Sequence, residues 1–317
     1  MGRKGFPRYA WGVFAYSLLV ILWGYFLRIS RSGDGCGTDW PLCHGAVVPA
    51  ASFPTMVEYI HRVSSGLVLL LVLAMAVWAF RSYPRGSLVR WAAAFTLLFT
   101  ITESLFGAVL VIFGWVAEDA SLARILIRPF HVTNTFLLMG ALALTPWWAS
   151  RCEPRSLHLP QGDRNLLLAG LATILVLGWT GSWTGLANAA FPAETLRGGL
   201  AQYMDPEHLL IYLRMAHPAL AVPGLLLLGW LGLRLRERGT ATRRLGLGIA
   251  GSAAAQLAVG PLAILLPEGV GVRLLHLFLA DLTWIFLLLA GASLMGHRIP
   301  ASSALRRPSR LDATPKA

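Results

Sequence analysis

Eight long apolar runs constrain this chain more than any other feature of its sequence. They cover approximately residues 11–29, 57–80, 89–113, 129–149, 165–183, 209–233, 245–266 and 273–296. Each is close to the roughly 20 apolar residues that an α-helix needs to cross a membrane. Only 13% of the residues are charged, whereas about 25% is usual in soluble domains. The sequence therefore predicts an all-α polytopic membrane protein with eight transmembrane helices.

The distribution of basic residues predicts how the chain is oriented. The net charge of +12 is also found in nucleic-acid-binding proteins, but here most of the 27 basic residues lie on one side of the predicted membrane. They occur before the first run, after the second, fourth and sixth runs, and after the last. Lys and Arg accumulate on the cytoplasmic side. We therefore expect both termini in the cytoplasm and no nucleic-acid partner.

The two halves of the chain resemble each other weakly. Three segments of the first half have a counterpart in the second. Glu103 and Gly107 correspond to Gln256 and Gly260. Arg128–His131 corresponds to Arg273–His276, and Tyr59–Arg62 corresponds to Tyr212–Arg214. Because each half has four runs, both copies have the same orientation. We expect two pseudo-symmetric four-helix bundles, related by an axis along the membrane normal. They comprise residues 1–150 and 151–300, and 301–317 form a disordered cytoplasmic tail.

Four of the eight histidines lie inside apolar runs, each near the start of an even-numbered run. They are His61, His131, His217 and His276. A single membrane histidine is usually a hydrogen-bonded packing residue, but four at one depth on the outer side, two per half, suggest ligands. Two imidazoles on facing helices can bind a haem iron. A metal site and a proton relay are the alternatives, although zinc prefers additional Cys or carboxylate ligands. We favour two haem-sized pockets, one per half.

The residue three positions before each histidine lies on the same helical face. It is Arg128, Arg214 or Arg273 in three cases and Glu58 in the fourth. These arginines and Arg62 are candidates for binding haem propionates, although arginines at helix ends also extend toward the membrane surface without a ligand. A carboxylate beside a haem edge can move protons. Glu58 therefore suggests that the N-terminal half reacts with its haem.

A loop rich in glycine connects the first two runs and contains Cys36 and Cys43. The two cysteines are seven positions apart on the predicted outer side, where disulfides form. Such a pair can close a small disulfide loop next to the N-terminal pocket. Both a purely structural role and a redox role remain open.

The loop and the start of the second run together resemble haem A synthases of bacteria and mitochondria. The similar segments are Cys36 to Gly45, with Asp39-Trp40-Pro41-Leu42-Cys43, and Glu58-Tyr59-Ile60-His61-Arg62. The eight runs, the half-repeat and the four histidines extend the resemblance over nearly the whole chain. It implies an enzyme that oxidises the C8 methyl of haem O to a formyl group, giving haem A for terminal oxidases.

The resemblance also implies roles for individual residues. By this resemblance, His217 and His276 would be the iron ligands of a haem b cofactor, and His61 and His131 the axial residues of the substrate pocket. Glu58 would be the catalytic acid, and Cys36 and Cys43 would form a disulfide. The implied location is a bacterial inner membrane. The lipid bilayer, haem O synthase and a terminal oxidase or its assembly factors are the implied partners, and a homo-oligomer is compatible with the sequence.

This sequence departs from the family in two places. Some relatives have a second cysteine pair in the loop between the fifth and sixth runs, but residues 184–208 contain no cysteine, so no mechanism here can use that pair. Glu103 stands where a Gln-like residue is expected, and its role is open.

Two other functions would explain parts of the sequence. A non-catalytic dihaem b cytochrome, passing electrons to or from quinol, would explain the histidines and arginines but not Glu58 or the cysteine loop. A membrane thiol oxidoreductase using Cys36 and Cys43 would leave the four histidines unexplained.

Overall fold

The computed structural model describes residues 3–151, 154, 157–193, 195–266 and 269–296. Within these residues the chain consists of helices and connecting loops, without β-strands. The expected disordered tail, 301–317, lies outside them, so its disorder remains a prediction.

Eight helices are long and apolar enough to cross a membrane, which confirms the predicted all-α polytopic fold. They are α1 (Phe6–Ile29), α2 (Phe53–Ser82), α3 (Leu88–Ile112), α4 (Leu122–Ala149), α5 (Gln161–Ala190), α7 (Leu209–Leu235), α8 (Thr240–Leu265) and α9 (Val270–Gly296). The short helix α6 (Leu196–Met204) precedes α7, and two 3-10 turns, Arg3–Gly5 and Arg236–Arg238, complete the helical elements.

Helices α2 and α4 begin one or more turns before the predicted apolar runs, and a serine caps each of them. Ser52 accepts a hydrogen bond from the Thr55 amide at the start of α2, and Pro54 occupies the first turn. Ser87 and Ser121 cap α3 and α4 in the same way. A side-chain oxygen at this position satisfies an amide that the helix leaves free, and proline suits the first turn. Hydropathy alone cannot show these extra turns.

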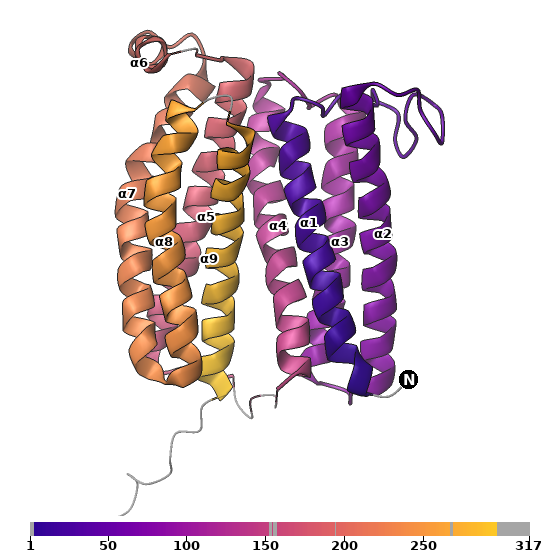
Figure 1. The fold of residues 1–317 in the computed structure, drawn as a ribbon, viewed down its shortest axis with the longest axis vertical. Helices are drawn as coiled ribbons and strands as arrows, with labels where there is room; N and C mark the ends of the chain where they lie inside the picture. Colours follow the sequence, from indigo (N-terminus) through magenta and orange to yellow (C-terminus); the bar gives the residue numbers. More distant parts are fainter. Residues whose placement is uncertain (1–2, 152–153, 155–156, 194, 267–268, 297–317) are drawn as a thin grey trace, which may run out of the picture.

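The spanning helices form two groups that lie side by side (Figure 1). Helices α1 to α4 make one four-helix bundle, and α5, α7, α8 and α9 make the other. The start of α1 and the end of α9 lie at the same end of the molecule, as an even number of spans requires. The pseudo-two-fold relation between the bundles remains a prediction.

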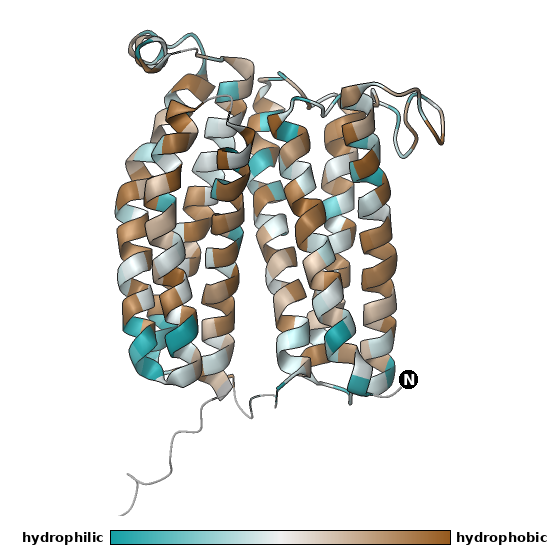
Figure 2. Cartoon of the chain, in the orientation of Figure 1, coloured by the Kyte–Doolittle hydropathy of each residue, from teal (hydrophilic) through white to brown (hydrophobic). Residues whose placement is uncertain are grey.

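Helices α4 and α9 lie at the centre of the molecule. Over its most apolar 18-residue stretch, each is 56% buried, whereas the other spans are 22–28% buried. The outer helices consist mainly of apolar residues along their length (Figure 2), and many of their large apolar side chains are exposed, as expected where lipid replaces water. The central pair therefore positions the two bundles relative to each other.

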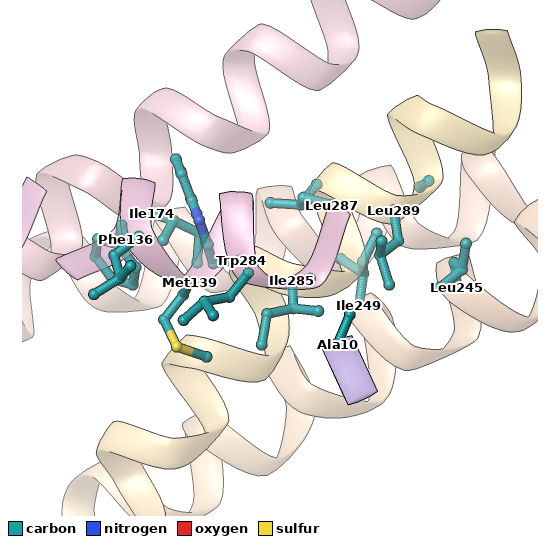
Figure 3. Packing of buried hydrophobic residues seen from close by; sticks show 14 of the residues in the cluster. Ala10, Phe136, Met139, Ile174, Leu245, Ile249, Trp284, Ile285, Leu287 and Leu289 are labelled. Carbon is teal, nitrogen blue, oxygen red and sulfur yellow. The ribbon is translucent and has the colours of Figure 1, made fainter. Parts of the chain in front are cut away.

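Aromatic and aliphatic side chains fill the contact between α4 and α9 (Figure 3). The rings of Phe136 and Trp284 pack 5.1 Å apart between centroids. Gly140 lets the two helices approach closely, because a Cβ atom there would lie 2.5 Å from Cδ1 of Leu288. Small residues have this role in many membrane helix pairs.

Candidate functional site

The structure places two of the four predicted histidines in each bundle. His61 and His131 lie on α2 and α4, and His217 and His276 on α7 and α9. Each is about two to three turns from the start of its helix, and all four helices begin at the end of the molecule opposite the N-terminus (Figure 1). The histidines therefore share one depth within the two bundles.

In the C-terminal bundle, the rings of His217 and His276 face each other. Their centroids are 6.0 Å apart and their planes are nearly perpendicular, at 87°. Two imidazoles that bind one iron from opposite sides, with metal–nitrogen bonds of about 2 Å, have ring centres roughly 6 Å apart. Nδ1 of His276 is buried, without a hydrogen-bond partner among the described residues. The spacing of the two imidazoles therefore fits a pair that would hold a haem iron.

Glycines border these two rings. A Cβ atom on Gly181 of α5 would lie 3.1 Å from Cε1 of His217, and one on Gly260 of α8 would lie 3.6 Å from Cε1 of His276. A Cβ atom on Gly181 would therefore crowd the His217 ring, whereas one on Gly260 would make an ordinary contact with His276. Gln256 of α8 donates to the main-chain oxygen of His276 over 3.0 Å, which ties the ligand helix to its neighbour.

In the N-terminal bundle, His61 and His131 lie near a carboxylate. Nε2 of His131 is 3.0 Å from Oε1 of Glu103, and the His131 ring stacks on Phe106, with centroids 5.6 Å apart. His61 is close enough to interact electrostatically with both Glu103 and His131. Its ring packs on Gly24 of α1, where a Cβ atom would approach Cε1 to 2.9 Å.

Hydrogen-bond donors hold the Glu103 carboxylate in place. Asn134 donates to Oε2 over 2.6 Å, and Thr135 donates to Oε1 over 2.7 Å, next to the His131 contact. Thr102 in turn donates to the Asn134 side chain. Glu103, whose role the sequence left open, is therefore fixed beside the N-terminal histidines.

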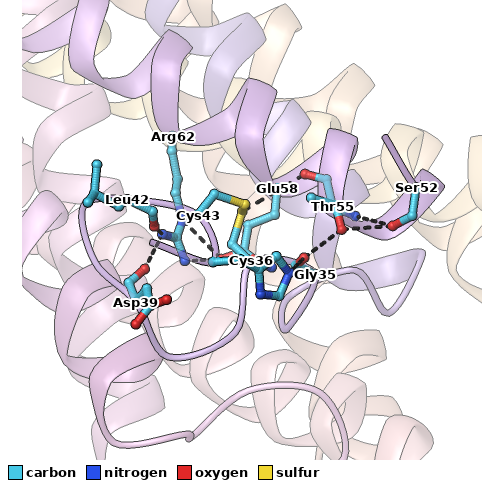
Figure 4. Close-up of a disulfide and its surroundings, with 10 residues drawn as sticks. Gly35, Cys36, Asp39, Leu42, Cys43, Ser52, Thr55, Glu58 and Arg62 are labelled. Atoms are coloured by element: carbon cyan, nitrogen blue, oxygen red, sulfur yellow. Dashed lines mark hydrogen bonds and ion pairs between the residues drawn. A yellow bond between two sulfur atoms is a disulfide. The ribbon is translucent and has the colours of Figure 1, made fainter. Parts of the chain in front are cut away.

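The Cys36–Cys43 disulfide predicted from the sequence is formed, with an S–S distance of 1.99 Å. It closes the outer loop over the start of α2 (Figure 4). Gly35 lies against the first turn of α2, and its carbonyl accepts from the Thr55 hydroxyl over 2.7 Å. The loop is thus fastened by a covalent bond and by polar contacts.

Glu58 lies beneath this loop and is only 3% exposed. Its Oε2 accepts from the Cys36 amide over 2.8 Å, and its Oε1 accepts from Arg62 Nε and Nη2 over 3.1 and 2.6 Å. Arg62 also donates through Nη1 to the carbonyls of Asp39 and Leu42. The carboxylate is therefore paired and hydrogen-bonded, and the arginine that pairs with it also binds the loop (Figure 4).

The remaining propionate candidates differ in their partners. Arg214 donates to the Gln202 side chain and to the carbonyls of Ala187 and Phe191. Arg128 is 8% exposed, and its Nε has no hydrogen-bond partner among the described residues. Arg273 lies near the start of α9 and is only partly buried. A buried guanidinium with a free N–H suits an anionic ligand.

Two polar groups of these bundles were not predicted from the sequence. Arg124, 5% exposed, donates to three carbonyls of the loop before α4, those of Val116, Ala117 and Asp119. Asp281 on α9 is 1% exposed. It is the only carboxylate in the last apolar run, a signal that could have identified it, since an acid inside a membrane span is usually functional.

Fold and site together define a polytopic helical membrane protein with two histidine pairs suited to haem. Residues 51–288 match the family model COX15-CtaA, described as cytochrome oxidase assembly protein. The chain belongs to this family, which confirms the resemblance that the outer loop and the Glu58 motif carry.

Several relatives have informative names. The chain is 42% identical over 293 residues to a protein of Thermus thermophilus named protoheme IX farnesyltransferase, covering 90% of this chain and 48% of that protein. It therefore spans about half the length of that relative. A protein of Exiguobacterium sp. named heme A synthase is 44% identical to this chain, over 33% of this chain and 35% of that protein. A protein of Bacillus pumilus with the same name is 28% identical, over 68% of each chain.

Proposed function

We propose that the protein is a haem A synthase, which oxidises the C8 methyl of haem O to a formyl group. The observation that carries this proposal is the difference between the two histidine sites. The N-terminal pair lies near Glu58, Glu103 and the disulfide loop, whereas His217 and His276 face each other across 6.0 Å with no carboxylate hydrogen-bonded to either ring among the described residues. One site is built to react and the other to hold a redox cofactor. Relatives named heme A synthase support this assignment.

In this proposal the C-terminal bundle binds the cofactor. His217 and His276 would hold the iron of a haem b, and Arg214 and Arg273, one turn away on the same helices, would bind its propionates. When bound, this haem supplies one-electron transfer. The glycines beside both imidazoles keep the ring positions open, and Gln256 fixes the main chain of His276.

The N-terminal bundle binds the substrate. His61 and His131 orient haem O, and the buried Arg128 binds a propionate through its free N–H group. Glu58 accepts or holds a proton close to the reacting methyl group, and Arg62 keeps its carboxylate in place under the loop. Because a porphyrin with a farnesyl chain is strongly apolar, we propose that it enters from the lipid.

The same proposal covers location and partners. The protein lies in a bacterial inner membrane with both termini in the cytoplasm, where most of its basic residues then lie. A haem O synthase supplies the substrate, in keeping with relatives of twice this length that are named protoheme IX farnesyltransferase. The product goes to a terminal oxidase.

The test is Glu58→Gln, with extraction and quantification of the haems. We expect haem A to fall by at least about tenfold, because the amide can neither release nor accept a proton as a carboxyl group does. Glu118→Gln is the matched control, since Glu118 is an exposed acid in a surface ion pair. Unchanged haem A in Glu58→Gln would exclude an essential ionisable group at this position.

Pigment analysis of the purified protein separates the synthase from the dihaem cytochrome. Haem b together with haem O, haem A or a hydroxylated intermediate supports the synthase. Two haems b per chain, and no other haem, would favour the cytochrome.

A further inference from the structure

Asp281 is a buried acid at the contact between the two bundles. It lies on the central helix α9 and is 1% exposed. Its Oδ1 accepts a hydrogen bond of 3.4 Å from the hydroxyl of Tyr25 on α1, and its Oδ2 has no partner among the described residues. Burying a carboxylate without full hydrogen bonding is unfavourable, and in a membrane span such a group is a functional candidate.

The Asp281–Tyr25 contact connects the two histidine sites. Asp281 follows His276 by five residues, about 7.5 Å along the helix axis. Tyr25 follows Gly24, the residue on which the His61 ring packs. Helix α9 therefore carries a ligand of one site and α1 borders the other, and this hydrogen bond joins the two helices.

Few other charged groups lie near Asp281. From α1, Tyr25 donates to it, and the Arg28 guanidinium lies 5.9 Å from the Tyr25 ring centroid. Glu103 of α3 acts electrostatically on Tyr25. The titratable residues of α4 are Arg124, Arg128 and His131, and none of them forms an ion pair with Asp281 in the described part of the chain. The other two helices packed on α9 have no titratable residue at this depth, since α5 has none after Arg164 and α8 none after Arg244. A charge on Asp281 therefore has no ion-pair partner among the described residues.

We propose that Asp281 binds one proton for each electron that reduces the haem held by His217 and His276, and that the Tyr25 hydroxyl conducts this proton from the N-terminal bundle. The inference rests on the proposed function. With water as the oxygen source, conversion of the methyl to the formyl group (R–CH3 + H2O → R–CHO + 4 H+ + 4 e−) releases electrons and protons in equal number. Each electron that would reduce the ferric iron is matched by one proton that forms the O–H bond of the Asp281 carboxyl. Both leave again when an external electron acceptor reoxidises the haem. The net charge of the buried region stays constant, which matters where the dielectric constant is low.

The test is a redox titration of the C-terminal haem in the purified, haem-loaded protein between about pH 6 and pH 8.5. Coupling of one proton to one electron lowers the midpoint potential by about 59 mV for each tenfold fall in proton concentration. We expect this slope in the wild type and in Asp281→Glu. We expect it to disappear in Asp281→Asn, which still offers an oxygen acceptor to Tyr25.

Thr283→Val is the matched control, because Thr283 is a buried polar residue on the same helix that hydrogen-bonds Ser252 of α8. It should keep the slope. If Asp281 only holds the bundles together, Asp281→Asn will keep it too, and the proposal is wrong. A wild-type potential independent of pH also overturns it, so the inference can fail even if Asp281→Asn does not fold.

Tyr25→Phe tests the conducting role. It leaves the carboxyl group in place, so the pH slope should remain, while reduction of the C-terminal haem by substrate should slow at least about fivefold. An unchanged rate would remove Tyr25 from the path. Absence of any haem at His217 and His276 would refute the proposed function and this inference together, whereas a bound haem with a pH-independent potential refutes only the inference.

Discussion

Glu58 and Arg62 form an ion pair that differs physically from a surface salt bridge. Their side chains are only 4% and 12% exposed, and each also binds the outer loop, through the Cys36 amide and through the Asp39 and Leu42 carbonyls. Solvent therefore screens the pair weakly, and each charge depends on the other. Removing one partner would leave the other buried and unpaired.

Arg62→Ala should consequently lower the free energy of unfolding by about 3 kcal/mol, because it leaves the Glu58 carboxylate and two loop carbonyls without their donor. Thermal unfolding in detergent measures this change. The control is Arg31→Ala, whose pair with Glu118 is 50% and 65% exposed and should contribute less than about 1 kcal/mol. Equal shifts in the two variants would contradict a buried role for Arg62.

At the level of residues, the sequence identifies candidate residues more readily than it identifies their contacts. The four histidines and Glu58 stand out because polar groups are rare in apolar runs, and Cys36 and Cys43 because they are close in sequence. The partner of Asp281 could not be predicted, since Tyr25 is 256 residues away. Nor could the two carbonyls that bind Arg62, because backbone positions in an irregular loop leave no pattern in side chains.

At the level of elements, helices are placed so that glycines face the imidazoles. Gly24 of α1 packs on His61 and Gly181 of α5 packs on His217, with Cβ positions only 2.9 and 3.1 Å from the rings. Each first helix of a bundle therefore fixes the position of a histidine on the second. The close contact of each helix with the imidazole is possible because glycine has no side chain.

Gly24→Ala should therefore displace the His61 ring and weaken haem binding in the N-terminal bundle. Overpacking of this kind typically costs about 1–2 kcal/mol, or roughly 5–30-fold in affinity. The haem content per chain, measured by extraction, reports the loss. Gly12→Ala on the same helix is the control, because a Cβ atom there has no neighbour within 4 Å. Equal haem content in both variants would show that the contact with His61 is unimportant.

The disulfide loop is the second element that determines the N-terminal site. Replacing both Cys36 and Cys43 by serine removes a constraint on a short loop, for which chain entropy predicts a loss of about 2.5 kcal/mol. Since the Cys36 amide also binds Glu58, haem A output should fall several-fold. Thermal unfolding with and without reductant checks the first effect. The wild type should respond to reductant and the double variant should not.

The extents of the elements were predictable only where hydropathy defines them. The eight spans follow from apolar length, but the first turns of α2 and α4, which precede the apolar runs, follow the caps Ser52 and Ser121. Helix α6 was missed because it has only nine residues and a mixed composition. Arg214 binds Gln202 of α6, so even this short helix is tied to the helix that carries His217.

For the molecule as a whole, the contact of α4 with α9 lies between the two bundles and joins two helices that carry histidines of different pairs. These two helices carry His131 and His276, and Phe136 and Trp284 pack directly between them. If the C-terminal haem serves the N-terminal reaction, as we propose, electrons must cross this contact. A change there should impair the reaction without emptying either site.

Gly140→Leu should impair the reaction while both sites keep their haem. A side chain at Gly140 collides with Leu288, at 2.5 Å from the Cβ position, and approaches Trp284, so α4 and α9 must move apart. Because the contact lies between the bundles, the histidine pairs within each bundle should still bind haem. We expect unchanged haem b content per chain and at least a several-fold loss of haem A. Gly251→Leu on α8, where a Cβ atom meets nothing within 4 Å, should leave both quantities unchanged. Loss of haem b in Gly140→Leu would mean that the bundles fold as one unit, and unchanged haem A would mean that the reaction does not depend on this contact.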